Sequence, residues 1–231
     1  MEKLTWRYPY EDCVDIPSKL TATQIKGRVL DQEAAEEAVG AKAVKQEGQP
    51  IYRPHFMTEA KGLTPAQRGT ALHLAMQYIP LEGDHTAEGI RTTLDRLAAD
   101  SFLTRLQREA VPPESLSAFF LSPLGRAMVA ARECQREFKF SILVPAQDYY
   151  PGAEQEEILL QGVIDAWFDN GDGVTVVDFK SDRIVPGGEA ARAEEYRPQL
   201  EAYSKALSAI LDRPVQRKVL WFFATGTQFE L

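Results

Sequence analysis

The stretch Gly162–Lys180 reads GVIDAWFDNGDGVTVVDFK and predicts the centre of the fold. Two apolar runs rich in β-branched residues flank the polar turn Asp169–Gly173, a pattern typical of a β-hairpin. Each run carries one aspartate, Asp165 in the first and Asp178 in the second. The side chains of Lys180 and Asp178 are expected on the same face of the strand, because side chains alternate along a strand. The hairpin is therefore expected to bring two carboxylates and an ammonium group together.

This set of groups predicts a site for a divalent cation. Two carboxylates at neighbouring ladder positions repel each other unless a positive charge lies between them. Mg²⁺ or Mn²⁺ is the expected neutraliser, because hard cations prefer carboxylate and water ligands. Lys180 can then contact a phosphate and stabilise developing negative charge. Two alternatives stay open: Asp165 and Lys180 as ordinary turn and surface residues, or Asp165 and Asp178 as the carboxylate pair of a glycosidase.

A helix and a further strand are expected after the hairpin. The segment Glu194–Leu211 has an apolar helical stripe, and Gln199 and Tyr203 lie on one face of it. Together they can hydrogen-bond a phosphate or hold Lys180, or they are simply part of an amphipathic helix. Val215–Ala224 predicts a strand that is reached by a crossover, which favours parallel pairing.

Before the hairpin, the pattern changes from helical to extended. Arg136–Val144 alternates apolar and polar residues and predicts a strand. A helix is expected within Gly62–Pro80, with a capping box that starts at Thr64. His73 lies at the edge of the apolar stripe of this helix, where a structural role is the commoner one, and Gly69 permits close approach of another segment. Further helices are expected at Thr86–Ala99, Leu103–Ala110, Ser115–Leu121 and from Ser122 to about Glu133.

Composition narrows the class of protein. The chain of 231 residues has a net charge of −8 and two cysteines. The acidic balance argues against a protein that coats nucleic acid by bulk electrostatics. Two cysteines cannot hold a four-thiolate iron–sulfur cluster, and no P-loop motif for an ATP site is present. With no signal peptide and no apolar run of about 18 residues, we expect a cytoplasmic protein without membrane contact.

These patterns predict a single domain of mixed α/β class over residues 1–231. Its expected parts are an N-terminal arm and linker over residues 1–60, a helical region over 61–135, and a sheet-and-helix catalytic core over 136–231.

Four short motifs, taken in order, carry a family resemblance. They are RGTALH at Arg68–His73, GVID at Gly162–Asp165, VVDFK at Val176–Lys180 and YRPQLEAY at Tyr196–Tyr203. The set resembles the RecB-type nucleases of the PD-(D/E)XK superfamily, and most closely the C-terminal nuclease domain of AddA helicase–nuclease subunits. The resemblance implies a restriction-endonuclease-like core with a helical N-terminal half.

The resemblance also implies roles for matching residues. His73, Asp165, Asp178 and the backbone carbonyl of Phe179 would bind Mg²⁺, for which Mn²⁺ can substitute. Asp165, Asp178 and Lys180 would be the catalytic residues. Gln199 and Tyr203 match the family's Q-x-x-x-Y motif, which supports the site and contacts DNA.

The implied function is that of a metal-dependent deoxyribonuclease of the exonuclease type. Such a domain would belong to a helicase–nuclease of double-strand break repair and recombination. Its partners would be DNA, an attached helicase region and an AddB-like partner protein. The alternative is a catalytically degenerate nuclease fold that only binds DNA ends or a partner subunit.

Overall fold

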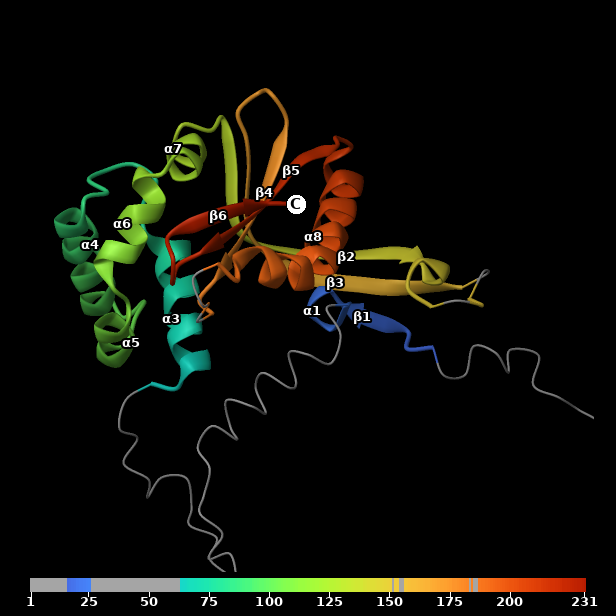
Figure 1. Cartoon of the computed structure of the whole chain (residues 1–231), viewed down its shortest axis with the longest axis horizontal. Coiled ribbons are helices and arrows are strands. Elements are labelled where there is room, and N and C mark those ends of the chain that lie inside the picture. Colours follow the sequence, from blue (N-terminus) through green and yellow to red (C-terminus); the bar gives the residue numbers. More distant parts are fainter. Residues whose placement is uncertain (1–15, 26–62, 151, 154–155, 183, 185–186) are drawn as a thin grey trace, which may run out of the picture.

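A computed structural model describes residues 16–25, 63–150, 152–153, 156–182, 184 and 187–231 of the chain (Figure 1). The expected N-terminal arm and linker lie largely outside these segments. Within them, we find no helix that combines the length and the apolar character needed to cross a bilayer.

The fold is built on a six-stranded mixed sheet with β3 at its centre, as the mixed α/β class predicts. The strands are β1 (Lys19–Thr21), β2 (Glu133–Pro145), β3 (Glu157–Asp169), β4 (Val174–Lys180), β5 (Val215–Phe222) and β6 (Thr227–Glu230). Strand β2 is antiparallel to β3 along its whole length, and β4 forms the expected antiparallel hairpin with β3. The crossover strand β5 is parallel to β4, as predicted, and β6 is antiparallel to β5.

One edge of β3 is shared by two strands. Strand β1 pairs with residues 159–161 of β3, and β4 pairs with residues 166–169. Because β2 occupies the other edge over the same positions, β1 and β4 must lie on one side with a gap between them. Residues 162–165 of β3 therefore have no strand partner on this side among the described residues. Asp165 lies at the end of this gap, next to β4.

The helices form two groups around the sheet. They are α1 (Ala22–Ile25), α3 (Pro65–Tyr78), α4 (Ala87–Ala99), α5 (Arg105–Ala110), α6 (Pro113–Leu121), α7 (Pro123–Val129), the 3₁₀ turn η3 (Ala146–Asp148) and α8 (Glu189–Leu211). Helices α3 to α7 gather at one side of the sheet, and α8 lies apart from them (Figure 1). Separate apolar clusters join each group to the sheet.

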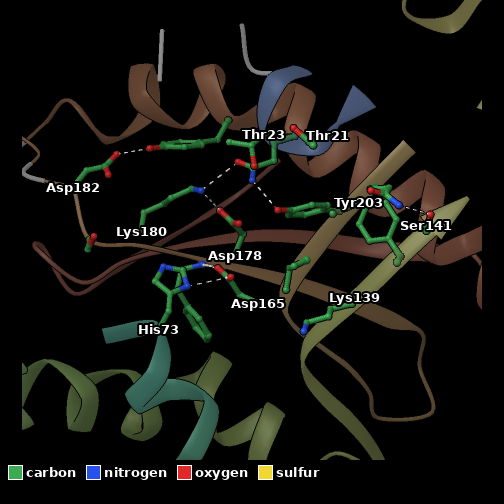
Figure 2. Close-up of a pocket in the computed structure, with 18 residues that line it drawn as sticks. Thr21, Thr23, His73, Lys139, Ser141, Asp165, Asp178, Lys180, Asp182 and Tyr203 are labelled. Carbon is green, nitrogen blue, oxygen red and sulfur yellow. Dashed lines mark hydrogen bonds and ion pairs between the residues drawn. The ribbon is translucent and has the colours of Figure 1, made fainter. Parts of the chain in front are cut away.

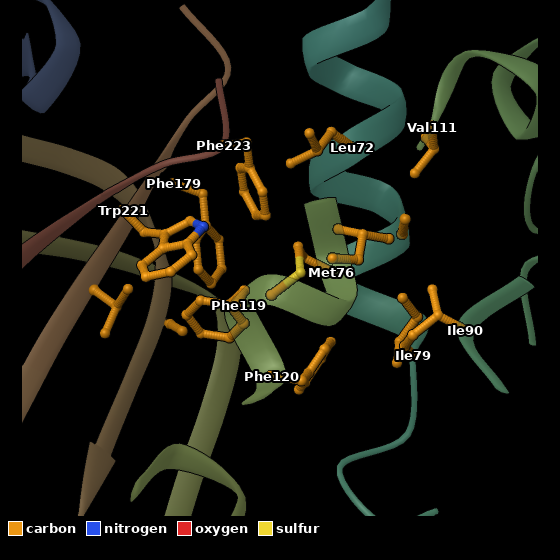
Figure 3. Close-up of a cluster of buried hydrophobic side chains, with 14 of the residues drawn as sticks. Leu72, Met76, Ile79, Ile90, Val111, Phe119, Phe120, Phe179, Trp221 and Phe223 are labelled. Atoms are coloured by element: carbon orange, nitrogen blue, oxygen red, sulfur yellow. The ribbon is translucent and has the colours of Figure 1, made fainter. Parts of the chain in front are cut away.

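An aromatic cluster between α6 and the sheet determines which way the side chains of β4 point (Figure 3). The ring of Phe119 meets Phe179 edge to face at a centroid distance of 5.1 Å and Trp221 at 5.2 Å. Phe179 is 2% exposed and lies between Asp178 and Lys180 in the sequence. Because strand side chains alternate, burial of Phe179 on this side turns Asp178 and Lys180 to the other.

Helix α3 is held at both ends. The predicted capping box is present, since the Thr64 hydroxyl accepts a hydrogen bond from the Gln67 backbone N–H and the Gln67 side chain accepts one from the Thr64 N–H. At the other end, Arg136 Nη1 of β2 donates to the carbonyls of Met76 and Ile79 at 2.6 Å and 2.5 Å. These bonds satisfy carbonyls that a helix end leaves without partners.

Some expected boundaries differ from the structure. Helix α7 ends at Val129 rather than near Glu133, because Glu133 already pairs with Asp169 in the sheet. The sheet therefore begins inside the expected helical region. The sheet also includes Lys19–Thr21, which we expected in an arm. The sequence did not predict this strand, because three residues are too few to show an alternation of apolar and polar side chains.

The Arg136 bonds predict a stability effect. Replacing Arg136 with alanine leaves two carbonyls at the end of α3 without their charged donor, so the free energy of unfolding should fall by about 1–3 kcal/mol. Urea denaturation measures the change. Arg132→Ala is the control, because Arg132 is exposed and its loss should cost less than about 0.5 kcal/mol. Equal stability of the two variants would contradict this account of α3.

Candidate active site

The hairpin brings Asp165 and Asp178 to the same place. The ladder between β3 and β4 ends at the pair Ala166 and Val177, so the next two residues are these aspartates. Beyond this point the backbone is held by a side chain: Asp165 Oδ2 accepts a hydrogen bond of 2.7 Å from the Phe179 N–H. The predicted approach of the two carboxylates is thus seen in the structure.

His73 reaches the hairpin from α3. Its Nδ1 lies 3.1 Å from Asp165 Oδ1 (Figure 2). Burial lowers the pKa of His73, but the carboxylates of Asp165 and Asp178 outweigh burial, so its pKa is above the ordinary value. Gly69 permits the close approach of α3, because a Cβ there would lie 2.8 Å from Ser181 Oγ, just after the end of β4.

Asp165 is ionised more readily than an ordinary aspartate. Burial raises the pKa of Asp165. Three groups lower it by a larger amount: His73 through its charge and hydrogen bond, Lys180 through its charge, and the Phe179 N–H. The net pKa of Asp165 therefore lies below its usual value. A carboxylate kept charged at this position is suited to bind a cation.

Glu137 is a site residue for which the sequence predicted no role. It lies on β2, and one ligand atom each from His73, Glu137 and Asp165 lie within 4.8 Å of one another. Its φ of 54° is in the left-handed region, so the backbone is strained here in the middle of a strand. Burial and then Asp165 raise the pKa of Glu137. The position of Glu137 opposite Asp165 in an antiparallel strand pair could have predicted that it belongs to the site.

Asp178 and Lys180 form a buried ion pair. Lys180 Nζ lies 2.6 Å from Asp178 Oδ2, and Asp178 is 2% exposed. The contact lacks hydrogen-bond geometry, so this oxygen accepts no hydrogen bond among the described residues. Burial raises the pKa of Asp178 to about 6; Lys180 opposes this shift and Asp165 adds to it. A bound cation would satisfy the oxygen and favour the charged carboxylate.

Helix α8 holds the other side of Lys180. Gln199 Oε1 accepts a hydrogen bond of 3.2 Å from Lys180 Nζ, and Gln199 Nε2 donates to the Tyr203 hydroxyl at 2.7 Å. Gln199 and Tyr203 are both buried. Gln199 thus makes the contact with Lys180 that the sequence left open for this pair, and Tyr203 holds Gln199.

Tyr196 and Asp182 complete the surroundings of Lys180, and the sequence predicted no role in the site for either of them. Lys180 Nζ lies 3.9 Å from the centre of the Tyr196 ring, a cation–π contact. The Tyr196 hydroxyl donates to Asp182 Oδ2 at 2.5 Å, and Arg192 Nε donates to the same oxygen at 3.0 Å. The alternation of Asp178, Lys180 and Asp182 was the available signal for Asp182.

The donor set fits a hard divalent ion. The described ligand atoms that group together are those of His73, Glu137 and Asp165, an imidazole and two carboxylates. Asp178, which we expected as a ligand, is not in this group, and its Oδ2 lies against Lys180. A cavity of about 870 Å³ opens beside these groups and is lined by His73, Asp165, Asp178 and Lys180 (Figure 2). The part of the Phe179 carbonyl as a ligand stays a prediction. An imidazole, carboxylates and a lysine at such a cavity are typical of metal-dependent phosphodiesterases.

Comparisons with known proteins identify the family. Residues 44–229 match the PD-(D/E)XK nuclease superfamily. The chain is 39% identical to an ATP-dependent helicase/nuclease subunit of Desulforudis audaxviator over 97% of its length, and 38% identical to that of Bacillus cytotoxicus over 96%. It spans 18% of the length of each of these relatives. The chain belongs to the PD-(D/E)XK nuclease superfamily, whose members use divalent metal ions.

A solved structure, that of SSO0001, is also similar to this chain. The match covers 73% of this chain and 75% of the other with a TM-score of 0.32 and 13% identity. At that level it carries no argument about the site.

The position of Glu137 predicts that it contributes to metal binding. Glu137→Gln keeps the size of the side chain and removes its charge, so the affinity for Mn²⁺ should fall by about 10- to 100-fold. Electron paramagnetic resonance of free Mn²⁺ gives the dissociation constant. Glu133→Gln, an exposed change on the same strand, should bind Mn²⁺ as the wild type does. Unchanged affinity in Glu137→Gln would exclude Glu137 as a ligand.

Proposed function

We propose that this chain is a deoxyribonuclease that hydrolyses DNA phosphodiester bonds with Mg²⁺, for which Mn²⁺ can substitute, and that it degrades DNA from ends as an exonuclease. The observation that carries the proposal is the convergence of His73, Asp165, Asp178 and Lys180 on one cavity. Superfamily membership supports it independently.

The metal ligands in this proposal are His73, Asp165, Asp178 and the Phe179 carbonyl, with Glu137 added from the geometry. The ion would lower the pKa of the attacking water and neutralise the phosphate. The protein holds Asp165 ready through two hydrogen bonds, one with His73 and one from the Phe179 N–H.

Lys180 is the proposed catalytic cation. Asp178, Gln199 and the ring of Tyr196 surround its Nζ, so the ammonium group is held in one position at the cavity. Fixed charge of this kind stabilises the negative charge that develops on a phosphate during hydrolysis. Gln199 and Tyr203 act by holding Lys180, and Tyr203 also lines the cavity and can contact DNA.

The relatives suggest the setting in which the activity would be used. The relatives that this chain matches are named helicase/nuclease subunits. We propose that this chain is the nuclease part of such an enzyme in the cytoplasm, joined to a helicase region and paired with an AddB-like partner protein. Its role would be to trim DNA ends in double-strand break repair and recombination.

A binding-only role is the second candidate function. A degenerate nuclease would be expected to have lost the ion pair or a metal ligand. Asp178, Lys180 and His73 are all in place, which favours the catalytic role.

Removing Lys180 should strongly slow cleavage. We expect Lys180→Ala to lower kcat on linear DNA by at least about 100-fold, because a positioned charge contributes that much to related reactions. Asp178→Asn should have a similar effect. Gel assays of end-labelled DNA measure the rates. Asp172→Asn, in the turn of the hairpin, is the control and should cut like the wild type. Full activity in Lys180→Ala would overturn the site assignment.

Metal removal should separate the two candidate functions. We expect EDTA to stop cleavage completely and Mg²⁺ or Mn²⁺ to restore it, because the proposed chemistry requires the ion. The rate of DNA cleavage during titration of each metal is the measurement. DNA binding without cleavage at every metal concentration would identify a binding module instead, and cleavage that resists EDTA would contradict the metal mechanism.

A further inference from the structure

An open face of the sheet leads away from the candidate metal site. Strands β2 and β3 extend beyond the group of helices α3 to α7 (Figure 1). In this part of the sheet, Leu160 and Ile164 of β3 are buried in the cluster with α8, whereas Gln161 and Val163 are partly exposed. The face that carries Gln161 and Val163 therefore points away from the α8 core. It ends at Asp165 of the site, since beyond this residue Trp167 is the β3 side chain that is buried with α8.

Polar side chains line up across this face on three strands. Ser141 of β2 and Thr21 of β1 are both register partners of Gln161. One step closer to the site, Lys139 is the partner of Val163. All of these residues line the same cavity as the metal-site groups. We call Thr21, Lys139, Ser141 and Gln161 the polar track.

The polar track lies on one side of the metal site and Lys180 on the other. In Figure 2, Lys180 and Asp182 are at one end of the cavity and Ser141 is at the other, with Asp165 and Asp178 between them. Gln161 precedes Asp165 by four positions on β3, which is roughly 13 Å along a strand. A chain that enters at the metal site has room to continue along the track.

The track offers hydrogen-bond donors that bind no other described residue. The Thr21 hydroxyl accepts a bond from the Gln24 N–H, which leaves its own hydrogen available. Gln161 Nε2 donates to Ser141 Oγ at 2.8 Å, so the Ser141 hydroxyl hydrogen and a second amide hydrogen of Gln161 can still be donated.

Lys139 gives the track its positive charge. Its side chain is exposed, and it makes no ion pair with any other residue in the described part of the chain. Lys139 is close enough to Glu137 for its charge to lower the pKa of the Glu137 carboxyl, so the lysine lies beside the metal site. An unpaired ammonium group at this position is available for an anion. Hydroxyls, an amide and a lysine in a row are the groups that contact phosphate and sugar oxygens of a nucleic acid.

We propose that the polar track binds the sugar–phosphate backbone of one DNA strand next to the phosphate that is cut, with Lys139 as the phosphate contact nearest the metal site. This inference rests on the proposed nuclease function and adds a substrate-binding surface to it. The cavity of about 870 Å³ accommodates a short part of one strand rather than a duplex.

Part of the track lies outside the region that defines the superfamily. The superfamily match covers residues 44–229, whereas Thr21 and β1 precede it. The metal-site groups are all inside the match. The helicase/nuclease relatives, in contrast, match 97% of the chain. Lys139, Ser141 and Gln161 are inside the match, so Thr21 on β1 is the track residue that lies outside it.

The proposal is tested by binding of a short fluorescein-labelled single-stranded oligonucleotide to the 231-residue chain, with Ca²⁺ in place of Mg²⁺. We expect Lys139→Gln to raise Kd by roughly 3- to 10-fold. The slope of log Kd against log salt should fall by about 0.7, because one phosphate contact is lost. Thr21→Val, which keeps the side-chain shape, should raise Kd by roughly 2- to 5-fold.

Lys218→Gln is the matched control. Lys218 lies on β5, does not line the cavity and makes no ion pair with the described residues, so its loss changes the net charge equally. We expect wild-type Kd for this variant. If Lys139→Gln and Lys218→Gln raise Kd equally, the effect comes from the net charge of the protein rather than from the track. This result would overturn the proposal.

A phosphate contact can be located with strands that carry one neutral methylphosphonate at successive positions. When the methylphosphonate is at the contacted position, the Kd of the wild type should rise to the Kd of Lys139→Gln for the natural strand. The Kd of Lys139→Gln should not rise further on this modified strand. Additive losses at every position would overturn the contact. Cleavage without any effect of Lys139→Gln on binding would refute the track alone. Binding through Lys139 without cleavage would instead refute the proposed nuclease function.

Discussion

The carboxylate of Asp165 is the constraint on which the rest of the site depends. Strands β3 and β4 separate after Ala166 and Val177, and the Phe179 N–H would lose its partner there. Asp165 Oδ2 accepts this hydrogen bond, while Oδ1 meets His73. One side chain therefore satisfies a buried backbone donor, holds a helix against the sheet and keeps a negative charge at the cavity. A polar group buried without such partners would be costly.

Strand β4 is held in place from both of its faces. On one side the ring of Phe179 packs among Phe119 and Trp221, and on the other Lys180 contacts Gln199 and the Tyr196 ring. A shift of the strand toward either layer would break contacts in the other. The position of the ammonium group thus depends on aromatic rings, those of Phe119 and Trp221, that do not themselves line the cavity.

The sequence predicted those parts of the fold whose signals are local. The hairpin, the capping box at Thr64 and the parallel crossover to β5 each rest on a turn, a cap or a period within a short window, and the structure contains all of them. The approach of His73 to Asp165 needed the family resemblance, because no local pattern relates a helix to a distant strand.

What the sequence did not predict depends on long-range pairing or on local strain. Strand β1 is only three residues long, and it is recognised as a strand through its pairing with β3. Glu137 takes a left-handed conformation in the middle of a strand, which no propensity suggests for a glutamate. The pairing of β1 also has a consequence for folding. Because Thr21 must find Gln161, closing this loop costs entropy before any contact repays it. We therefore expect the cavity to gain its β1 wall late in folding, after the hairpin of β3 and β4 has formed.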